Sequence, residues 1–117
     1  MVELEWVGDV LVVRPLGDLD LSTAPAFRTL VDRELDRRRP SNIVVDLSKV
    51  CFMDSSGLGA ILGRFRRIQS RGRRMWLIAP QPTVRSILEL SGLAKLVTVF
   101  TSGEECFRRV LGDGGEG

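Results

Sequence analysis

Asp54, Ser55 and Ser56 are the residues of this chain whose types and spacing favour chemistry. They lie between an apolar run, residues 43–47, and an amphipathic segment that begins with small residues. This order predicts a strand, a short loop and the N-terminus of a helix that carries hydroxyl groups. A helix N-terminus has unpaired N–H groups and a partial positive charge, so it favours a bound phosphate. The pattern therefore predicts that Ser55 carries a reversible phosphate.

Asp54 also has a purely structural interpretation, as the N-cap of that helix. Capping is the commoner use of an arbitrary Asp-Ser-Ser-Gly stretch. As the cap, Asp54 would accept a hydrogen bond from the N–H of Ser56 or Gly57 and leave the Ser55 hydroxyl on the first turn, pointing outward. Capping and phosphorylation are therefore compatible.

Several kinds of catalytic or cofactor site are disfavoured by the sequence. A serine hydrolase needs a base such as histidine, of which the chain has none, and its elbow motif needs glycine where Met53 stands. The glycines at 57, 59 and 63 miss the dinucleotide-binding spacing, and no P-loop lysine is present. The two cysteines lack metal-ligand spacing. We therefore expect no cofactor, no metal and no enzymatic activity.

Length and composition indicate one domain with a hydrophobic core, since the chain has 117 residues and 44% of them are apolar. The segment Met1–Trp6 lacks the apolar run of a signal peptide, and no stretch approaches membrane-spanning length. A cytoplasmic protein with no membrane partner is the expectation. Cys51 and Cys106 are both expected to be buried thiols in a reducing compartment.

Positive charge is concentrated in one part of the chain. The formal net charge is only +2, yet seven arginines and no acidic residue lie between Arg64 and Arg85. A solvated helix face and loop is the preferred interpretation, with an acidic protein or a nucleic acid as alternatives. Direct nucleic-acid binding is disfavoured, because the total charge is small and the basic run has little aromatic or glycine-rich interleaving. The role of this segment stays open.

The hydrophobic pattern predicts strands that alternate with helices. Strands are expected at 2–7, 10–16, 42–47, 74–79 and 95–100, and helices at 23–38, 56–71, 83–90 and 103–111. The tight turn Gly8-Asp9 makes the first two strands antiparallel, whereas the later strands alternate with helices and so run parallel. Residues 1–112 are expected to form one α/β domain and residues 113–117 a flexible tail.

Two further aspartates, Asp18 and Asp20, follow the second strand. On their own they are turn residues, and the loop ends at Ser22 and Thr23, either of which is a good N-cap for the next helix. The carboxyl ends of parallel strands meet at one edge of a sheet, where such folds place function. Asp18, Asp20, Asp54 and Ser55 are therefore expected to share one surface.

These motifs resemble those of the STAS domain family and, within it, the bacterial anti-sigma factor antagonists, above all the sporulation members. The resemblance covers nearly the whole chain. It rests on Phe52–Gly59 with Ile61–Arg64, on Gly17–Asp20, on the strand Ile43–Leu47 and on Ser91-Gly92-Leu93. The chain departs from the pattern in its aspartate at position 18, where the sporulation members have glutamate, in its richness in arginine and in its tail.

The resemblance implies a single STAS-type domain, a mixed sheet of about five strands with about four helices mostly on one face. It also implies partner switching. The unmodified protein binds an anti-sigma factor that is itself a serine kinase, and the sigma factor is released. The kinase uses its ATP to phosphorylate Ser55, which abolishes binding, and a serine phosphatase reverses the modification. The alternative is a STAS-type scaffold or general-stress regulator with a different kinase partner.

The resemblance assigns roles to individual residues. Ser55 is the phosphoacceptor, Asp54 caps the helix and orients Ser55, and Ser56 is an unmodified neighbour. The partner-binding residues would be Asp18, Asp20, Ser22, Thr23, Asp54, Ser55, Ser56, Gly57, Leu58 and Gly59. Leu93 is a weaker candidate, for which ordinary packing at a helix end is preferred. We expect a monomer.

Overall fold

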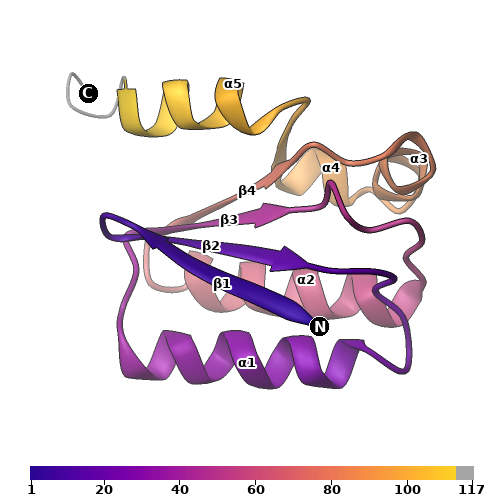
Figure 1. Ribbon diagram of the computed structural model, residues 1–117, viewed down its shortest axis with the longest axis horizontal. Helices are drawn as coiled ribbons and strands as arrows, with labels where there is room; N and C mark the ends of the chain where they lie inside the picture. The colour runs from indigo at the N-terminus through magenta and orange to yellow at the C-terminus, as the bar shows by residue number, and fades with distance from the viewer. Residues whose placement is uncertain (113–117) are drawn as a thin grey trace.

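A five-stranded sheet in the order β1-β2-β3-β4-β5 runs through the centre of the protein (Figure 1). The computed structural model describes residues 1–112, so the tail expected at 113–117 lies outside the described residues. β1 (Val2–Val7) pairs antiparallel with β2 (Val10–Pro15), and β3 (Asn42–Asp46), β4 (Arg74–Ile78) and β5 (Thr98–Phe100) continue the sheet in parallel. The mixed sheet expected from the sequence is confirmed.

The helices cover the two faces of the sheet unequally. α1 (Ala24–Arg37) and α2 (Ser55–Gln69) lie under one face, whereas α5 (Gly103–Phe107) and its π-helical continuation η1 (Arg108–Gly112) cross the other (Figure 1). The remaining two, α3 (Pro82–Leu90) and α4 (Leu93–Leu96), lie near the carboxyl ends of the parallel strands. No helix within residues 1–112 combines the length and the apolar composition needed to cross a bilayer.

Strand alternation divides the apolar side chains into two clusters. On β4, Met75 and Leu77 join the cluster packed against α1 to α4, while Ile78 and the half-buried Trp76 belong to the smaller cluster under α5. Because α5 and η1 are short, they cover the second face less completely than α1 and α2 cover the first. Within residues 1–112, part of the second face is therefore left uncovered.

The element boundaries differ from expectation mainly after residue 90. The strand expected at 95–100 is wrong in its first half, because residues 93–96 form the helix α4 and β5 begins at Thr98. Gly92, at φ 84°, ends α3 and lets the chain start this new turn. The helix expected at 103–111 changes to π-helical geometry at Arg108. Earlier elements agree with expectation to within two residues.

Candidate functional site

The loops that follow β2 and β3 lie against each other at the carboxyl ends of these strands. The N–H of Leu19 donates to the carbonyl of Phe52 (3.0 Å), and the N–H of Asp54 donates to the carbonyl of Leu19 (3.3 Å). Leu19 and Met53 also form a parallel bridge, and both side chains are buried. The expectation that these two loops share one surface is confirmed.

Asp54 fixes both the start of α2 and the position of the neighbouring loop. Its Oδ1 accepts hydrogen bonds from the N–H groups of Ser56 (2.8 Å) and Gly57 (3.0 Å), as the capping interpretation predicts. Its Oδ2 accepts from the N–H of Leu21 in the other loop (3.0 Å). One carboxylate therefore caps the helix and ties the two loops together.

Gly57 is the point of closest approach between α2 and the loop after β2. A Cβ at this position would lie 2.1 Å from the carbonyl oxygen of Leu19 and 2.9 Å from the Cγ of Met53. Gly59 and Gly63, in contrast, have no neighbour within 4 Å of such a Cβ. The close packing that the small residues of this helix allow therefore depends on Gly57, whereas Gly59 contributes a flat, exposed surface.

Asp20 shapes the loop after β2 from within. Its Oδ1 accepts from the Ser22 hydroxyl (2.8 Å) and from the N–H groups of Ser22 (3.0 Å) and Thr23 (3.2 Å). These hydrogen bonds, led by that of the Ser22 hydroxyl, hold the pKa of Asp20 below its ordinary value. The carboxylate of Asp20 is thus engaged within its own loop, while Asp18 is exposed.

Thr23, one of the two residues expected as the N-cap of α1, is at that position, but neither it nor Ser22 caps the helix with its side chain. Thr23 occupies the N-cap position without a side-chain capping hydrogen bond. Its hydroxyl donates to the carbonyl of Asp18 (2.8 Å) and accepts from the N–H of Asp20 (2.9 Å), while the Ser22 hydroxyl bonds to Asp20. Both hydroxyls are therefore occupied by the loop and stabilise its turn rather than the helix.

Ser55 is the first residue of α2 and is exposed. It lies at the rim of a hollow of about 300 Å³ between α2 and the α3–α4 segment. Besides Ser55, the hollow is lined by Leu58, Gly59 and Leu62 of α2 and by Ser91, Leu93 and Leu96. The exposed hydroxyl at a helix N-terminus can accept a phosphoryl group. With no histidine in the chain, it has no imidazole base to make it a catalytic nucleophile.

Exposed apolar side chains gather around the same edge. Within the part of the chain that the structure describes, the large hydrophobic residues classed as exposed are Met1, Leu21, Phe52, Leu90 and Leu96. Leu21 and Phe52 belong to the two joined loops, and Leu96 lines the hollow beside Ser55. Met1 lines a smaller hollow with Asp18 and Ser22. Such a concentration is typical of a surface that binds another protein.

Part of this surface was predicted from the sequence, and part of it was not. Leu58 and Gly59 were candidates and line the hollow, and Leu93, for which packing was preferred, is both buried and part of the lining. Leu62 and Leu96 were not candidates. The sequence offered a signal only for Leu90, which lies outside the helical spacing of Val84 and Leu88, the buried residues of α3.

Asp46, at the end of β3, connects β3 to β2 and to the start of the following loop through hydrogen bonds. Its Oδ2 accepts from Nε of Arg14 (2.9 Å), and its Oδ1 accepts from the N–H of Ser48 (2.9 Å). Burial alone would raise the pKa of Asp46, but the hydrogen bonds from Arg14 and Ser48 hold it below its ordinary value. Arg14 also forms ion pairs with Glu3 and Glu5 on β1.

The two cysteines differ, contrary to the prediction that both are buried. Cys106 of α5 is buried, which raises the pKa of its thiol to about 11. Cys51 is exposed because it lies in the loop before Asp54, where Leu47, Val50 and Met53 are the residues buried in the core. The tendency of cysteine to be buried is overridden here by its position in a surface loop.

Within residues 1–112, some arginines of the arginine-rich segment form ion pairs and others do not. Arg64 and Arg67 of α2 form ion pairs with Asp32 of α1, at 3.0 and 2.9 Å, and Arg67 also pairs with Asp36. These contacts hold α1 against α2. Arg73 and Arg74, which lead into β4, are exposed at the opposite end of the sheet from Ser55.

Sequence comparison connects this geometry to known proteins. The model of the STAS domain family matches residues 1–106. The anti-sigma F factor antagonist of Paenibacillus polymyxa is 39% identical over 99 residues, which cover 85% of this chain and 85% of that protein. The similarity therefore includes the two joined loops, α2 and most of the sheet.

Structural comparison gives the same relationship. The anti-sigma factor antagonist SpoIIAA in its unphosphorylated form superposes with a TM-score of 0.83 at 32% identity, covering 96% of this chain and 97% of that one. The Bacillus cell fate determinant SpoIIAA in its phosphorylated form superposes with a TM-score of 0.74 at 31% identity, covering 94% and 99%. The chain belongs to the STAS domain family, and its similarity to anti-sigma factor antagonists extends over nearly its whole length.

Proposed function

We propose that this protein is an anti-sigma factor antagonist that acts by partner switching. Unphosphorylated, it binds an anti-sigma factor that is also a serine kinase, and the sigma factor is released. Phosphorylation of Ser55 by that kinase ends the binding, and a serine phosphatase restores the unmodified form. The pathway proposed is that of the sporulation relatives, and the protein acts in the cytoplasm as a monomer.

The observation that carries the proposal is the placement of Ser55. Ser55 is exposed on the first turn of α2. It directly follows the Asp54 cap and lies at the rim of the apolar hollow. A kinase can reach this hydroxyl without unfolding the helix. A partner that covers the hollow must also cover the serine.

The chemistry belongs to the kinase, and this chain supplies the acceptor. The Ser55 oxygen forms a bond to the γ-phosphorus of ATP as the β–γ anhydride bond breaks, and ADP leaves. The hydroxyl proton goes to a base of the kinase. The chain itself is proposed to be a binding protein with no cofactor of its own.

A phosphate at Ser55 changes this surface mainly through charge. It adds about −1.5 to −2 charges at neutral pH beside Asp54 and in the same joined-loop surface as Asp18 and Asp20. A partner seated on the hollow would have to desolvate that charge or oppose it. Repulsion of this kind costs several kcal/mol, and each ~1.4 kcal/mol is a tenfold change in affinity. A switch of a hundredfold or more therefore needs no refolding.

The proposed binding surface consists of the two joined loops and the first turns of α2. Its residues are Asp18, Asp20, Ser22, Thr23, Asp54, Ser55, Ser56, Gly57, Leu58 and Gly59. The apolar hollow extends it toward Leu62, Leu93 and Leu96. Because Asp20 and Asp54 are engaged in backbone hydrogen bonds, their role in binding is to hold the surface in shape.

A phosphorylation assay tests the proposal. The protein is incubated with ATP, Mg²⁺ and an anti-sigma kinase from the same genome, and its intact mass and phosphopeptides are measured. We expect one phosphate on the unmodified sequence and on Ser56→Ala, and none on Ser55→Ala. Ser56→Ala is a matched control, because it removes the neighbouring hydroxyl but leaves the Asp54 cap intact. The phosphoprotein is then expected to bind the kinase at least about a hundredfold more weakly.

Two results would contradict the mechanism. A phosphate on Ser56, or on both variants, would place the acceptor elsewhere. No phosphate with any kinase of this class would leave Asp54-Ser55-Ser56 as a helix cap and favour the alternative, a STAS-type scaffold or general-stress regulator with a different kinase partner.

A further inference from the structure

The hollow beside Ser55 continues along α2 into a second, smaller one. This second hollow, of about 240 Å³, is lined by Phe65 and Gln69 of α2, by residues 73–76 and by Leu96 and Thr98. Leu96 lines both hollows, and the lining on α2 passes from Leu62 in the first to Phe65 in the second. The two hollows therefore form one continuous depression, which we call the α2 groove.

The α2 groove follows one side of α2 along the whole helix. Ser55, Leu58, Leu62, Phe65 and Gln69 recur at intervals of three and four residues, so they lie on the same side. α2 has 15 residues, which span ~22 Å at the rise of an α-helix. The groove therefore has room along its length for about four turns of a second helix.

Apolar side chains form the middle of the groove. Leu62 and Phe65 of α2 are half-buried, so part of each side chain remains accessible. On the other wall, Leu96 is 59% exposed at the point where the two hollows meet. Gly59 adds room, since a Cβ at this position would meet no atom within 4 Å. An apolar strip of this kind, with polar residues at its ends, is typical of a surface that binds another protein.

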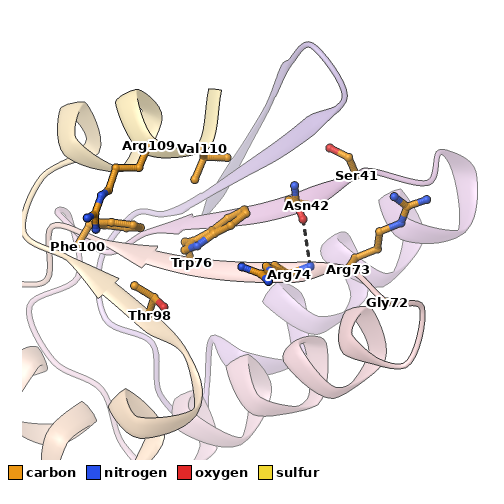
Figure 2. A pocket seen from close by; sticks show the side chains of 10 residues that line it. All are labelled: Ser41, Asn42, Gly72, Arg73, Arg74, Trp76, Thr98, Phe100, Arg109 and Val110. Atoms are coloured by element: carbon orange, nitrogen blue, oxygen red, sulfur yellow. Dashed lines mark hydrogen bonds between the residues drawn. The ribbon is translucent and has the colours of Figure 1, made fainter. Parts of the chain in front are cut away.

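The far end of the groove is basic. Arg73 and Arg74 line it, and no carboxylate lines either hollow in the described part of the chain. Figure 2 shows both arginines at the start of β4, where they also line a separate hollow of about 510 Å³ at Trp76. The N–H of Arg74 donates to Oδ1 of Asn42 (3.1 Å), which fixes its backbone. Within residues 1–112 neither guanidinium forms an ion pair, so this end of the groove matches acidic side chains of a partner.

The edge of the sheet at this groove favours a bound helix over an added strand. β5 has three residues, and its pairing with β4 begins at Trp76. Such a short edge strand offers few main-chain groups to an extended peptide. An amphipathic helix binds instead through side chains at positions i, i+3, i+4 and i+7, which suit an apolar groove of this length.

We propose that the α2 groove binds an amphipathic helix of the anti-sigma kinase. The apolar face of that helix packs on Leu62, Phe65 and Leu96, and acidic side chains at one of its ends pair with Arg73 and Arg74. This inference rests on the proposed function, because it names the part of the kinase that is recognised. It also gives part of the arginine-rich segment a role.

The two ends of the groove contribute independently to binding. Ser55 begins α2, whereas Arg73 and Arg74 follow its last residue, so the ~22 Å length of the helix separates them. This length exceeds the Debye length of ~8 Å at physiological ionic strength. A phosphate on Ser55 therefore leaves the pairing at the arginines unchanged, and the two effects on affinity are expected to multiply.

Charge-reversal variants test the basic end. The affinity of the full chain for the kinase is measured by calorimetry, with a non-hydrolysable ATP analogue so that Ser55 stays unmodified. Arg73→Glu with Arg74→Glu is expected to weaken binding by about thirtyfold or more and to make it less sensitive to salt. Arg33→Glu with Arg66→Glu is the matched control, because it makes the same charge change at exposed positions outside the groove. It should weaken binding by less than about threefold.

A second matched pair tests the apolar middle. Leu96→Gln is expected to weaken binding to the kinase by about tenfold or more. Leu90→Gln is the control, because Leu90 is 89% exposed and lines neither hollow, and it should change affinity by less than about twofold. Phosphorylation of Ser55 should still weaken binding by about a hundredfold in each of these variants.

Different results would overturn the inference and the proposed function. Equal losses in the two charge-reversed pairs, or an unchanged affinity for Leu96→Gln, would overturn the inference and leave the Ser55 switch intact. No binding of the unmodified chain to any kinase of this class would overturn both. A dimer of this chain in sedimentation that Leu96→Gln dissociates would assign the groove to a second copy instead. Tight binding of a single-stranded oligothymidylate that is lost with Arg73→Glu and Arg74→Glu would assign its basic end to a nucleic acid.

Discussion

The two ends of the parallel strands present opposite kinds of polar surface. At the carboxyl ends, the carboxylates of Asp20 and Asp54 are engaged in hydrogen bonds with backbone N–H groups. At the amino ends, Arg73, Arg74 and Arg109 line a hollow without an ion pair in the described part of the chain. Charge shapes the backbone at the carboxyl ends, whereas at the amino ends it is exposed at the surface.

This difference indicates how each end can work. Asp54 and Gly57 hold the surface in shape without a partner, so in the proposed switch a single new charge at Ser55 would be enough to change the affinity for the partner. Arg73, Arg74 and Arg109 form no ion pair within residues 1–112, so we expect that they can be substituted with small effects on stability. The two ends are therefore expected to respond to mutation in different ways.

Gly57→Ala is expected to have the largest effect on the carboxyl end. The added methyl group would collide with the carbonyl of Leu19 at 2.1 Å, so α2 and the loop must separate. We expect a loss of ~3 kcal/mol in the free energy of unfolding, measured with urea. Gly63→Ala is the control: it meets no neighbour within 4 Å and should be neutral or stabilising by up to about 1 kcal/mol. Equal effects at both positions would contradict the packing described.

Asp54→Ala comes next. It removes the acceptor of the N–H groups of Ser56, Gly57 and Leu21, so we expect a loss of ~2 kcal/mol, also by urea unfolding. Asp54→Asn keeps one amide oxygen as a cap and should lose less than half of that. If Asp54→Ala cost no more than a typical surface substitution, the carboxylate would not be what joins the two loops.

Acid should weaken the carboxyl end through Asp46. Because the folded-state pKa of Asp46 is below its ordinary value, its stabilisation is complete above about pH 4 and is lost as the pH falls through the folded value. Asp20 and Glu34 shift in the same direction. Urea unfolding as a function of pH should show that Asp46→Asn reduces this acid-side loss by ~1 kcal/mol. An unchanged slope would mean that the Arg14–Asp46 pair contributes nothing.

The amino end should show the smallest effects on stability. Arg73→Gln and Arg74→Gln are expected to change the free energy of unfolding by less than about 0.5 kcal/mol, because no ion pair within residues 1–112 is lost. Arg67→Gln, which loses contacts with Asp32 and Asp36, should cost up to about 1 kcal/mol. Thermal or urea unfolding of the three variants, measured side by side, tests this expectation. A larger loss of stability for Arg73→Gln or Arg74→Gln than for Arg67→Gln would contradict it.

The features predicted from the sequence are those determined locally. The strands at residues 42–47 and 74–79 follow from short apolar runs, and the Asp54 cap from its spacing to Ser56 and Gly57. The meeting of the two loops follows from parallel topology. Each of these depends on a few neighbouring residues or on a general rule of sheet geometry.

The features that were missed depend on contacts distant in sequence or on segments too short to show periodicity. The helix Leu93–Leu96 is one turn long, and the exposure of Cys51 depends on how its loop lies over the core. The hollow at Trp76 depends on how far α5 and η1, the last described elements, extend over the start of β4. Residues 74–79 alone do not indicate how far α5 and η1 extend over β4.

The central claim is that phosphorylation of Ser55 switches binding by a local change of charge on a preformed surface. Backbone NMR spectra of the unphosphorylated and phosphorylated protein test it most directly, when combined with the affinity of each form for the kinase. We predict shifts confined to residues 17–23 and 51–59, with affinity lower by about a hundredfold or more. Shifts that spread through β4 and α5, or equal affinities of the two forms, would contradict the account.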